Sequence, residues 1–276
     1  MLQYRVSYAI EADGLTKRYH QSSRPAVDNL QLSVAPGELF GFLGENGAGK
    51  TTTIKMLTGL IPLTEGRARI GGFDVQTNAR DAKRLVGYIP DNPYLYDRLT
   101  GREFMEFAAD LYSVRRDQAR QSRIHDLLTL FDLDAKAELL IGGYSRGMRQ
   151  KIALAAQLLH DPQVLFLDEP TVGLDPKSTR RLQDVLRVVA DRGVAVFLST
   201  HVLEVASGLC DRIGILHAGR LAALGTPAEL TNHGQRTLEE VFLTLTGGAG
   251  EHGEVARLLG TLQANSVPAR AQPQDL

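Results

Sequence analysis

The 276-residue sequence predicts an α/β fold with a mainly parallel sheet, an N-terminal antiparallel β region and a helical insertion. Three short apolar runs, Leu39–Leu43, Val164–Leu167 and Val194–Leu198, alternate with segments of helical periodicity. Such runs are typical of parallel strands that are buried on both faces. From about residue 95 to 158 only helical periods occur, which indicates the insertion, whereas polar and apolar residues alternate before residue 36.

The N-terminal alternation predicts antiparallel strands joined by Gly14 and by the loop Ser22–Pro25. A small hairpin is expected over Arg67–Val75, and a second one pairs Ile213–Leu216 with Leu221–Leu224. The continuous apolar runs alternate with helices, which predicts a mainly parallel sheet that is covered on both faces.

Helix signals dominate the insertion and the C-terminal part of the chain. Thr100 and Glu103 form a capping box before a helix, and Ser145 is expected to cap a later helix over Arg146–His160. A last helix is predicted over Leu238–Leu245. We therefore expect one domain over residues 1–246, with a helical subdomain at about 95–158, and a poorly ordered tail over 247–276.

Composition narrows the function classes. The formal net charge is −1, so no basic excess points to nucleic acid, and no nucleic-acid partner is expected. The single cysteine, Cys210, cannot form an internal disulfide, which favours a cytosolic protein. No apolar run approaches the roughly 18 residues of a membrane helix. A membrane role would therefore act through a partner.

The strongest motif is the phosphate-binding P-loop between a short apolar run and an expected helix over Thr52–Thr58. Its glycines let backbone N–H groups point at phosphate oxygens, and the helix N-terminus adds a positive dipole. Lys50 is expected to contact the β- and γ-phosphates, and Thr51 to bind Mg²⁺. The predicted nucleotide-binding residues of the loop are Gly44, Glu45, Asn46, Gly47, Ala48, Gly49, Lys50, Thr51 and Thr52.

Polar residues also follow three other predicted strands. Asp168 and Glu169 follow the run Val164–Leu167, Asp91 follows a strand ended by Pro90, and His201 follows Val194–Leu198. Carboxyl ends of parallel strands meet at one edge of a sheet, so these side chains can converge on the P-loop. Asp168 is placed to hold Mg²⁺ and Glu169 to act as general base for water. His201 is either structural or in reach of the γ-phosphate.

On these residues the chain resembles the nucleotide-binding subunit of an ABC transporter over about residues 10–246. The resemblance implies a P-loop NTPase core that binds ATP and Mg²⁺, with Asp168 in the Walker B run and His201 as the switch histidine. It also places Tyr19 where the family stacks an aromatic ring on adenine, although Tyr19 fits a surface strand equally well. Ser145 and Gly147 match the family signature sequence and would touch the ATP of the opposite subunit.

Two departures from the family pattern stand out. Arg146 and Met148 replace a glycine and the glutamine of the signature, and Asp91 replaces the glutamine that senses Mg²⁺ and couples to the membrane partner. Asp91 is still placed to meet Mg²⁺. Both departures resemble those of a bacterial exporter subgroup, as does the stretch Leu238–Phe242, and this favours export.

The resulting hypothesis is an ATPase subunit that dimerises with a second copy of itself, or with a homologous subunit, and drives an integral-membrane permease. It would lie peripherally at the cytoplasmic face of the cell membrane. The segment Asn92–Tyr96 is apolar for a loop, and it fits docking to the permease and packing on the insertion equally well. The main alternative is a non-transport member of the superfamily that acts on ribosomes or DNA. A P-loop kinase or GTPase fits less well, because it would leave the segment from Ser145 to Gly147 unexplained. A Rossmann dehydrogenase would require a different glycine spacing and would have no use for Lys50.

Overall fold

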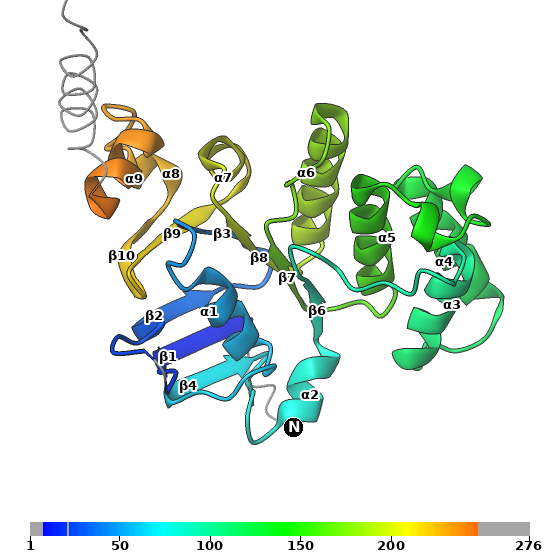
Figure 1. The fold of residues 1–276 in the computed structure, drawn as a ribbon, viewed down its shortest axis with the longest axis horizontal. Helices are drawn as coiled ribbons and strands as arrows, with labels where there is room; N and C mark the ends of the chain where they lie inside the picture. Colours follow the sequence, from blue (N-terminus) through cyan, green and yellow to red (C-terminus); the bar gives the residue numbers. More distant parts are fainter. Residues whose placement is uncertain (1–7, 21, 248–276) are drawn as a thin grey trace, which may run out of the picture.

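Two β-sheets with helices packed around them form the computed structural model of the chain, which describes residues 8–20 and 22–247 (Figure 1). The strands are β1 (Ile10–Lys17), β2 (Val27–Val34), β3 (Leu39–Gly44), β4 (Glu65–Ile70), β5 (Phe73–Asp74), β6 (Val86–Ile89), β7 (Val164–Asp168), β8 (Ala195–Thr200), β9 (Arg212–His217) and β10 (Arg220–Gly225). The larger sheet has the order β10-β9-β3-β8-β7-β6, parallel except for the β9–β10 pair. The smaller sheet is antiparallel, with the order β2-β1-β4-β5. The predicted fold class is therefore confirmed.

Helices join most of the parallel strands. They are α1 (Lys50–Leu57), α2 (Ala79–Arg84), α3 (Gly101–Leu111), α4 (Gln118–Leu130), α5 (Arg146–Leu158), α6 (Pro176–Asp191), α7 (Leu203–Leu209), α8 (Pro227–Leu230) and α9 (Leu238–Thr246), with short 3-10 turns at Asp134–Lys136 and Ile141–Gly143. The helices α2 and α7 were not predicted, because six or seven residues show too little periodicity. Among the described residues, no helix combines the length and the apolar composition that a membrane span requires.

The N-terminal sheet corrects one expectation. Gly14 does not join two strands but lies inside β1, with a φ of 60°. The pairing of β1 with β2 shifts register between Ala12 and Leu15, so Gly14 sits at an irregularity of the kind that a bulge produces. The strand β1 therefore continues past Gly14 and pairs with both β2 and β4. Most of the predicted tail, residues 248–276, lies outside the described residues.

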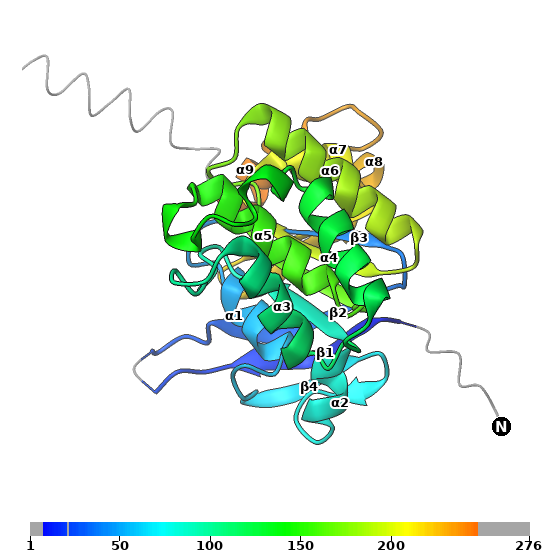
Figure 2. The ribbon, with the colours of Figure 1, turned by 90° about the vertical axis from the view of Figure 1, so that its right-hand side faces the viewer.

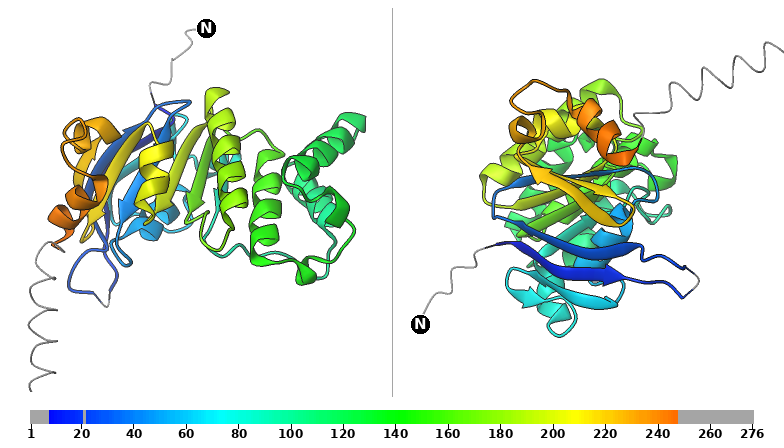
Figure 3. Two further views of the ribbon diagram at one scale, coloured as in Figure 1. Left: turned by 90° about the horizontal axis from the view of Figure 1, so that it is seen from above. Right: turned by 90° about the vertical axis from the view of Figure 1, so that its left-hand side faces the viewer.

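Alternation along the parallel strands separates two hydrophobic layers. Phe40 and Phe42 of β3, Phe166 of β7 and Phe197 of β8 point to the face that the antiparallel sheet and α1 cover. Ring centroids of neighbouring phenylalanines lie 5.1 to 6.5 Å apart. The leucines between them pack on the opposite face with α5, α6 and α7. Figure 3 shows the two sheets one above the other. The larger sheet is thus covered on one face by the smaller sheet and α1 and on the other face by helices, and this cover holds the ends of its strands in place.

The helices α3, α4 and α5 lie between β6 and β7 in sequence and form a group beyond the β6 edge of the larger sheet (Figures 1 and 2). Both predicted caps are present. The Thr100 hydroxyl accepts from the backbone N–H of Glu103 while the Glu103 carboxylate accepts from Thr100, and the Ser145 hydroxyl accepts from Met148. Each cap satisfies N–H groups that the first turn leaves free, so it fixes where the helix begins.

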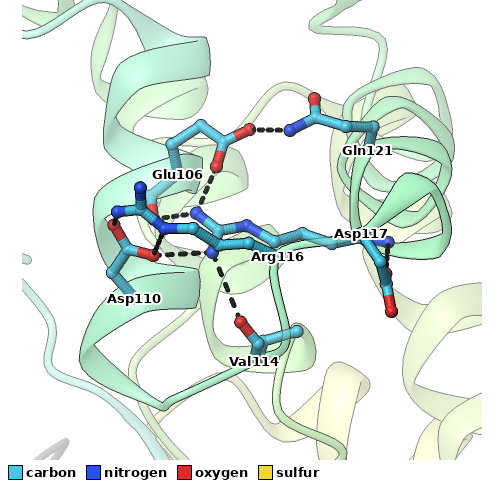
Figure 4. A network of polar contacts seen from close by, with 7 residues as sticks. Glu106, Asp110, Val114, Arg116, Asp117 and Gln121 are labelled. Atoms are coloured by element: carbon cyan, nitrogen blue, oxygen red, sulfur yellow. Dashed lines mark hydrogen bonds and ion pairs between the residues drawn. The ribbon is translucent and has the colours of Figure 1, made fainter.

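Arg120 of α4 ties this helix to α3 by pairing with Glu106 and Asp110. Figure 4 shows the polar network around these two carboxylates. The Arg120 side chain is only 2% exposed, pairs with Glu106, and donates to Asp110 Oδ1 at 2.6 Å. Arg116 also pairs with Asp110. Hydrogen bonds from Arg116 and then Arg120 lower the pKa of Asp110 to about 2. Because this value is below that of a free aspartate, the stabilisation is complete above about pH 4 and is lost as the pH falls towards 2.

We expect Arg120→Ala to lower the free energy of unfolding by about 2 kcal/mol, because it removes a buried cation from two carboxylates that are themselves partly exposed. Arg116→Ala is the matched control. It removes an exposed guanidinium from the same Asp110, and its effect should be much smaller. Urea denaturation of the two variants measures both values, and equal losses would contradict the role given to burial.

Candidate functional site

The P-loop connects the end of β3 to the start of α1. Gly47 and Gly49 have φ values of 83° and 112°, which side chains other than glycine rarely adopt. A Cβ on Gly49 would lie 2.4 Å from the backbone oxygen of Ala26, whereas a Cβ on Gly47 would meet no atom within 4 Å. Glycine is thus required at position 49 by both conformation and space, and the loop packs tightly on the residue before β2.

Lys50 places a buried ammonium at the centre of the site. Its Nζ donates to the backbone oxygens of Gly44 at 2.6 Å and Glu45 at 3.3 Å, and it lies 3.4 Å from Glu169 Oε1. The Lys50 side chain is only 7% exposed. A buried cation needs such oxygen partners, and phosphate oxygens would serve in the same way.

Asp168, the last residue of β7, links the P-loop helix to β8. Its Oδ2 accepts from the Thr51 hydroxyl at 2.7 Å, and its Oδ1 accepts from the Ser199 hydroxyl at 2.8 Å. Asp168 lies opposite Ser199 in the parallel pairing of β7 with β8. The Thr51 and Asp168 oxygens are hard donors at one edge of the cleft, which fits Mg²⁺, an ion that takes few protein ligands and keeps water and phosphate.

Glu169 adopts a strained backbone conformation beside this pair. Its φ is 51°, which costs a residue with a side chain on the order of 1–3 kcal/mol. Its Oε2 lies 2.9 Å from His201 Nδ1 and 3.3 Å from the His201 backbone N–H. Strain of this kind persists where the surrounding structure holds a side chain in place. Here Lys50 and His201 hold the carboxylate from two sides.

These side chains line a cleft of about 250 Å³. Its lining residues are Ala26, Glu45, Asn46, Gly47, Gly49, Lys50, Thr51, Thr52, Asp91, Asp168 and Glu169. The structure thus brings together most of the P-loop with Asp91 and the two acidic residues after β7. Sequence reasoning missed Ala26 and Ser199. Ala26 carried no signal, whereas a serine ending an apolar strand beside the Asp168 strand could have drawn attention to Ser199.

Six predicted residues do not line the cleft: Tyr19, Gly44, Ala48, Ser145, Gly147 and His201. Tyr19 is exposed, and Lys17 Nζ lies 5.3 Å from its ring centroid. Ser145 and Gly147 belong to the start of α5, where Ser145 is exposed. His201 reaches the cleft only through Glu169.

A larger groove of about 660 Å³ lies between α4 and α6. Most of its wall is apolar, and two of its arginines are paired within that wall: Arg123 donates to Asp161 at 2.7 Å, and Arg181 donates to the Leu130 backbone oxygen at 3.1 Å. The titratable side chains that follow β3, β6 and β7, among them Lys50, Asp91 and Glu169, converge in the smaller cleft instead. That cleft is therefore the candidate site.

Comparisons with known proteins show what the chain is similar to. The family described as "ABC transporter" matches residues 27–172. The fluoroquinolones export ATP-binding protein MT2762 of Mycobacterium tuberculosis is 38% identical over 245 residues, which cover 89% of this chain and 80% of that protein. A solved ATP-binding subunit of an ABC transporter superposes with a TM-score of 0.79 at 31% identity, covering 86% of this chain and 99% of that one. The dimeric bacterial ABC transporter cassette MJ0796 has a TM-score of 0.72 at 25% identity, covering 79% and 98% of the two chains.

Space and conformation at the P-loop predict different costs for two alanine substitutions. Gly49→Ala should lower the free energy of unfolding by about 3 kcal/mol or more and abolish nucleotide binding, because the new Cβ meets the Ala26 oxygen. Gly47→Ala should cost about 1 kcal/mol, from backbone strain alone. Chemical denaturation of both variants tests the difference. Equal costs would mean that the loop can move away from Ala26.

Proposed function

The chain belongs to the ABC transporter family and is an ATP-hydrolysing subunit of such a transporter, and from that premise we propose how its site works and what it drives. The proposal is that it powers export through a separate membrane permease. Export is supported by the similarity to a fluoroquinolones export ATP-binding protein. In this proposal the permease selects the transported compound, because the cleft of this chain fits a phosphate-bearing ligand.

The position of Glu169 between Lys50 and His201 is the observation that carries the mechanism. In the proposed mechanism the Lys50 ammonium transfers from the Glu169 carboxylate and the loop oxygens to the β- and γ-phosphates. Glu169 then loses its cation and becomes free to accept a proton from the attacking water. His201 keeps the carboxylate oriented through its ring and its backbone N–H.

Mg²⁺ would be held by the Thr51 hydroxyl and the Asp168 carboxylate, whose oxygens lie 2.7 Å apart. Asp91 also lines the cleft and is proposed as a further contact. Mg²⁺ neutralises charge on the phosphates when it is bound. Ser199 fixes the other Asp168 oxygen, so the carboxylate presents one defined edge to the cleft.

A second subunit is proposed to complete the site. Ser145 and Gly147 stand at the start of α5, outside the cleft of their own chain, and Ser145 is exposed. The N-terminus of a 13-residue helix attracts anions, since the N–H groups of its first turn have no carbonyl partner within the helix and its dipole is positive there. ABC transporter cassettes form dimers, as in the solved MJ0796 cassette. We infer that this helix end faces the γ-phosphate of the partner.

The proposed contact with the permease is the loop from Asp91 to Leu99 together with α3. Tyr94 at its centre is 96% exposed, while Tyr96 packs edge-on against Phe107 with ring centroids 5.1 Å apart. Phe107 and Leu111 of α3 are also exposed. Tyr96 packs on the helical insertion, as one expectation for this loop had it, while the exposed Tyr94 supports the other expectation, docking to the permease. Docking there would place the subunit peripherally at the cytoplasmic face of the membrane.

Glu169→Gln tests the mechanism. ATP binding should be retained, hydrolysis should fall by about 10²-fold or more, and an ATP-bound dimer should accumulate, because the amide cannot accept the proton of water. ATP turnover and size-exclusion chromatography in the presence of ATP measure these outcomes. Glu204→Gln, at an exposed position in α7, is the matched control and should hydrolyse ATP normally. Undiminished turnover in Glu169→Gln would remove Glu169 from its role.

Tyr94→Ala tests the docking surface. The amount of subunit that co-purifies with an integral-membrane protein from detergent-solubilised membranes should fall at least about tenfold, since exposed aromatic anchors often dominate interfaces. ATP turnover of the isolated subunit should stay near the wild-type value. Leu224→Ala serves as control, because Leu224 is exposed on β10 at the opposite edge of the sheet. Loss of co-purification in Leu224→Ala alone would place the docking surface elsewhere.

A further inference from the structure

Asp91 and Arg146, the two departures from the family pattern, form an ion pair. Arg146 NH2 donates to Asp91 Oδ1 at 3.1 Å, across 55 positions of sequence. Asp91 lines the nucleotide cleft, and Arg146 is the first residue of α5. The pair therefore joins the wall of the cleft to the helix whose start is proposed to meet the partner subunit.

The Arg146 side chain also lies against the loop that follows the catalytic carboxylates. A Cβ added to Gly173, which has a φ of 81°, would come within 2.8 Å of Arg146 Cδ and 3.0 Å of its Nε. Gly173 thus leaves room for the Arg146 stem between β7 and α6. The Arg146 stem contacts Gly173 and its guanidinium contacts Asp91. These two contacts hold the guanidinium beside Asp91, even though the Arg146 and Asp91 side chains are both more than half exposed.

The first turn of helix α5 carries two arginines and no carboxylate that could pair with them. The two arginines are Arg146 and Arg149. Positive charge is unfavourable near a helix N-terminus, so these arginines depend on carboxylates outside the helix. Arg149 finds Asp97 at 2.7 Å, and Asp97 does not line the cleft. Of the two pairs, only the one with Asp91 touches the nucleotide site.

The charge of the cleft explains why Asp91 needs a partner. The lining residues include four carboxylates, those of Glu45, Asp91, Asp168 and Glu169, and one ammonium, that of Lys50. A triphosphate entering this cleft meets a net negative wall, and like charges at such distances oppose binding. Arg146 lies outside the lining residues but supplies a second cation in direct contact with one of the carboxylates.

We propose that Arg146 is a positioning residue that neutralises Asp91 and holds it at the cleft wall, so that the site of the same subunit admits a nucleoside triphosphate. This inference rests on the proposed function of the cleft. It makes Arg146 and Asp91 a matched pair, in which the arginine is needed because the carboxylate is present. A glutamine at position 91 would carry no charge and would need no such arginine.

A double-mutant cycle tests the pairing through ATP affinity, measured by equilibrium dialysis with EDTA so that Mg²⁺ plays no part. Arg146→Ala should weaken ATP binding about tenfold at low salt and less at high salt, because the unpaired Asp91 repels the phosphates. Asp91→Asn combined with Arg146→Ala should restore the affinity to within about threefold of wild type. Arg146→Lys keeps the positive charge and should retain most of the affinity.

Arg149→Ala is the matched control, because it removes the same side chain from the same helical turn and breaks the pair with Asp97. It should leave ATP affinity unchanged. Thermal unfolding of each variant separates loss of fold from loss of affinity, and Arg146→Lys tests the charge even where Arg146→Ala is unstable. If wild type binds no ATP, the proposed function of the cleft fails. If wild type binds and Arg146→Ala binds equally well, or stays weak after Asp91→Asn is added, the pairing proposal is wrong.

Discussion

Backbone pairing of β7 with β8 places Asp168 directly opposite Ser199, and that register governs the rest of the site. The same sheet sets Leu43 of β3 against Thr200 of β8, so only β8 separates the strand that leads into the P-loop from the strand that carries the carboxylates. A slip of one residue would turn Asp168 towards the hydrophobic layer. The buried phenylalanines on one face and leucines on the other make such a slip costly, so the core determines which polar groups meet.

The nucleotide cleft contains more carboxylates than cations. Lys50 is buried and already satisfied by two backbone oxygens and Glu169. A ligand that binds Lys50 must replace these oxygen partners with acceptors that bind an ammonium equally well, and phosphate oxygens do so. Because Lys50 contacts Glu169, ligand binding and release of the catalytic base are coupled in the proposed mechanism. The Asp91–Arg146 pair extends the same balance to the outer wall of the cleft.

The helices beyond β6 are attached to that strand along the length of α5. Gln157 Oε1 accepts from the Tyr88 backbone N–H at 3.2 Å and from the Tyr112 hydroxyl at 3.0 Å. His160 stacks on Tyr112 with ring centroids 3.7 Å apart, and burial lowers the pKa of His160, which favours the neutral ring. At its other end α5 reaches Asp91 through Arg146. Helix α5 thus contacts β6 near one end and the loop that follows β6 at the other.

Local sequence determined those parts of the protein whose physics is local. The P-loop, the apolar runs of the parallel strands and the caps at Thr100 and Ser145 each depend on neighbours within a few residues, and the structure shows these elements where the sequence predicts them. Composition of the strands was enough to predict a parallel sheet, because only strands buried on both faces are apolar throughout.

Tertiary structure decided the rest, for reasons that no short window contains. Gly14 looked like a turn because glycine favours positive φ in turns and in bulges alike, and only the pairing of β1 with two strands separates them. Ser199 became a partner of Asp168 through strand register, which local sequence does not encode. In the sequence Arg146 and Asp91 are departures from the family pattern 55 positions apart, and the fold places the Arg146 guanidinium 3.1 Å from Asp91 Oδ1. Exposed side chains leave no periodic trace in a sequence, so this pairing emerges only when packing brings the loop after β6 next to the start of α5.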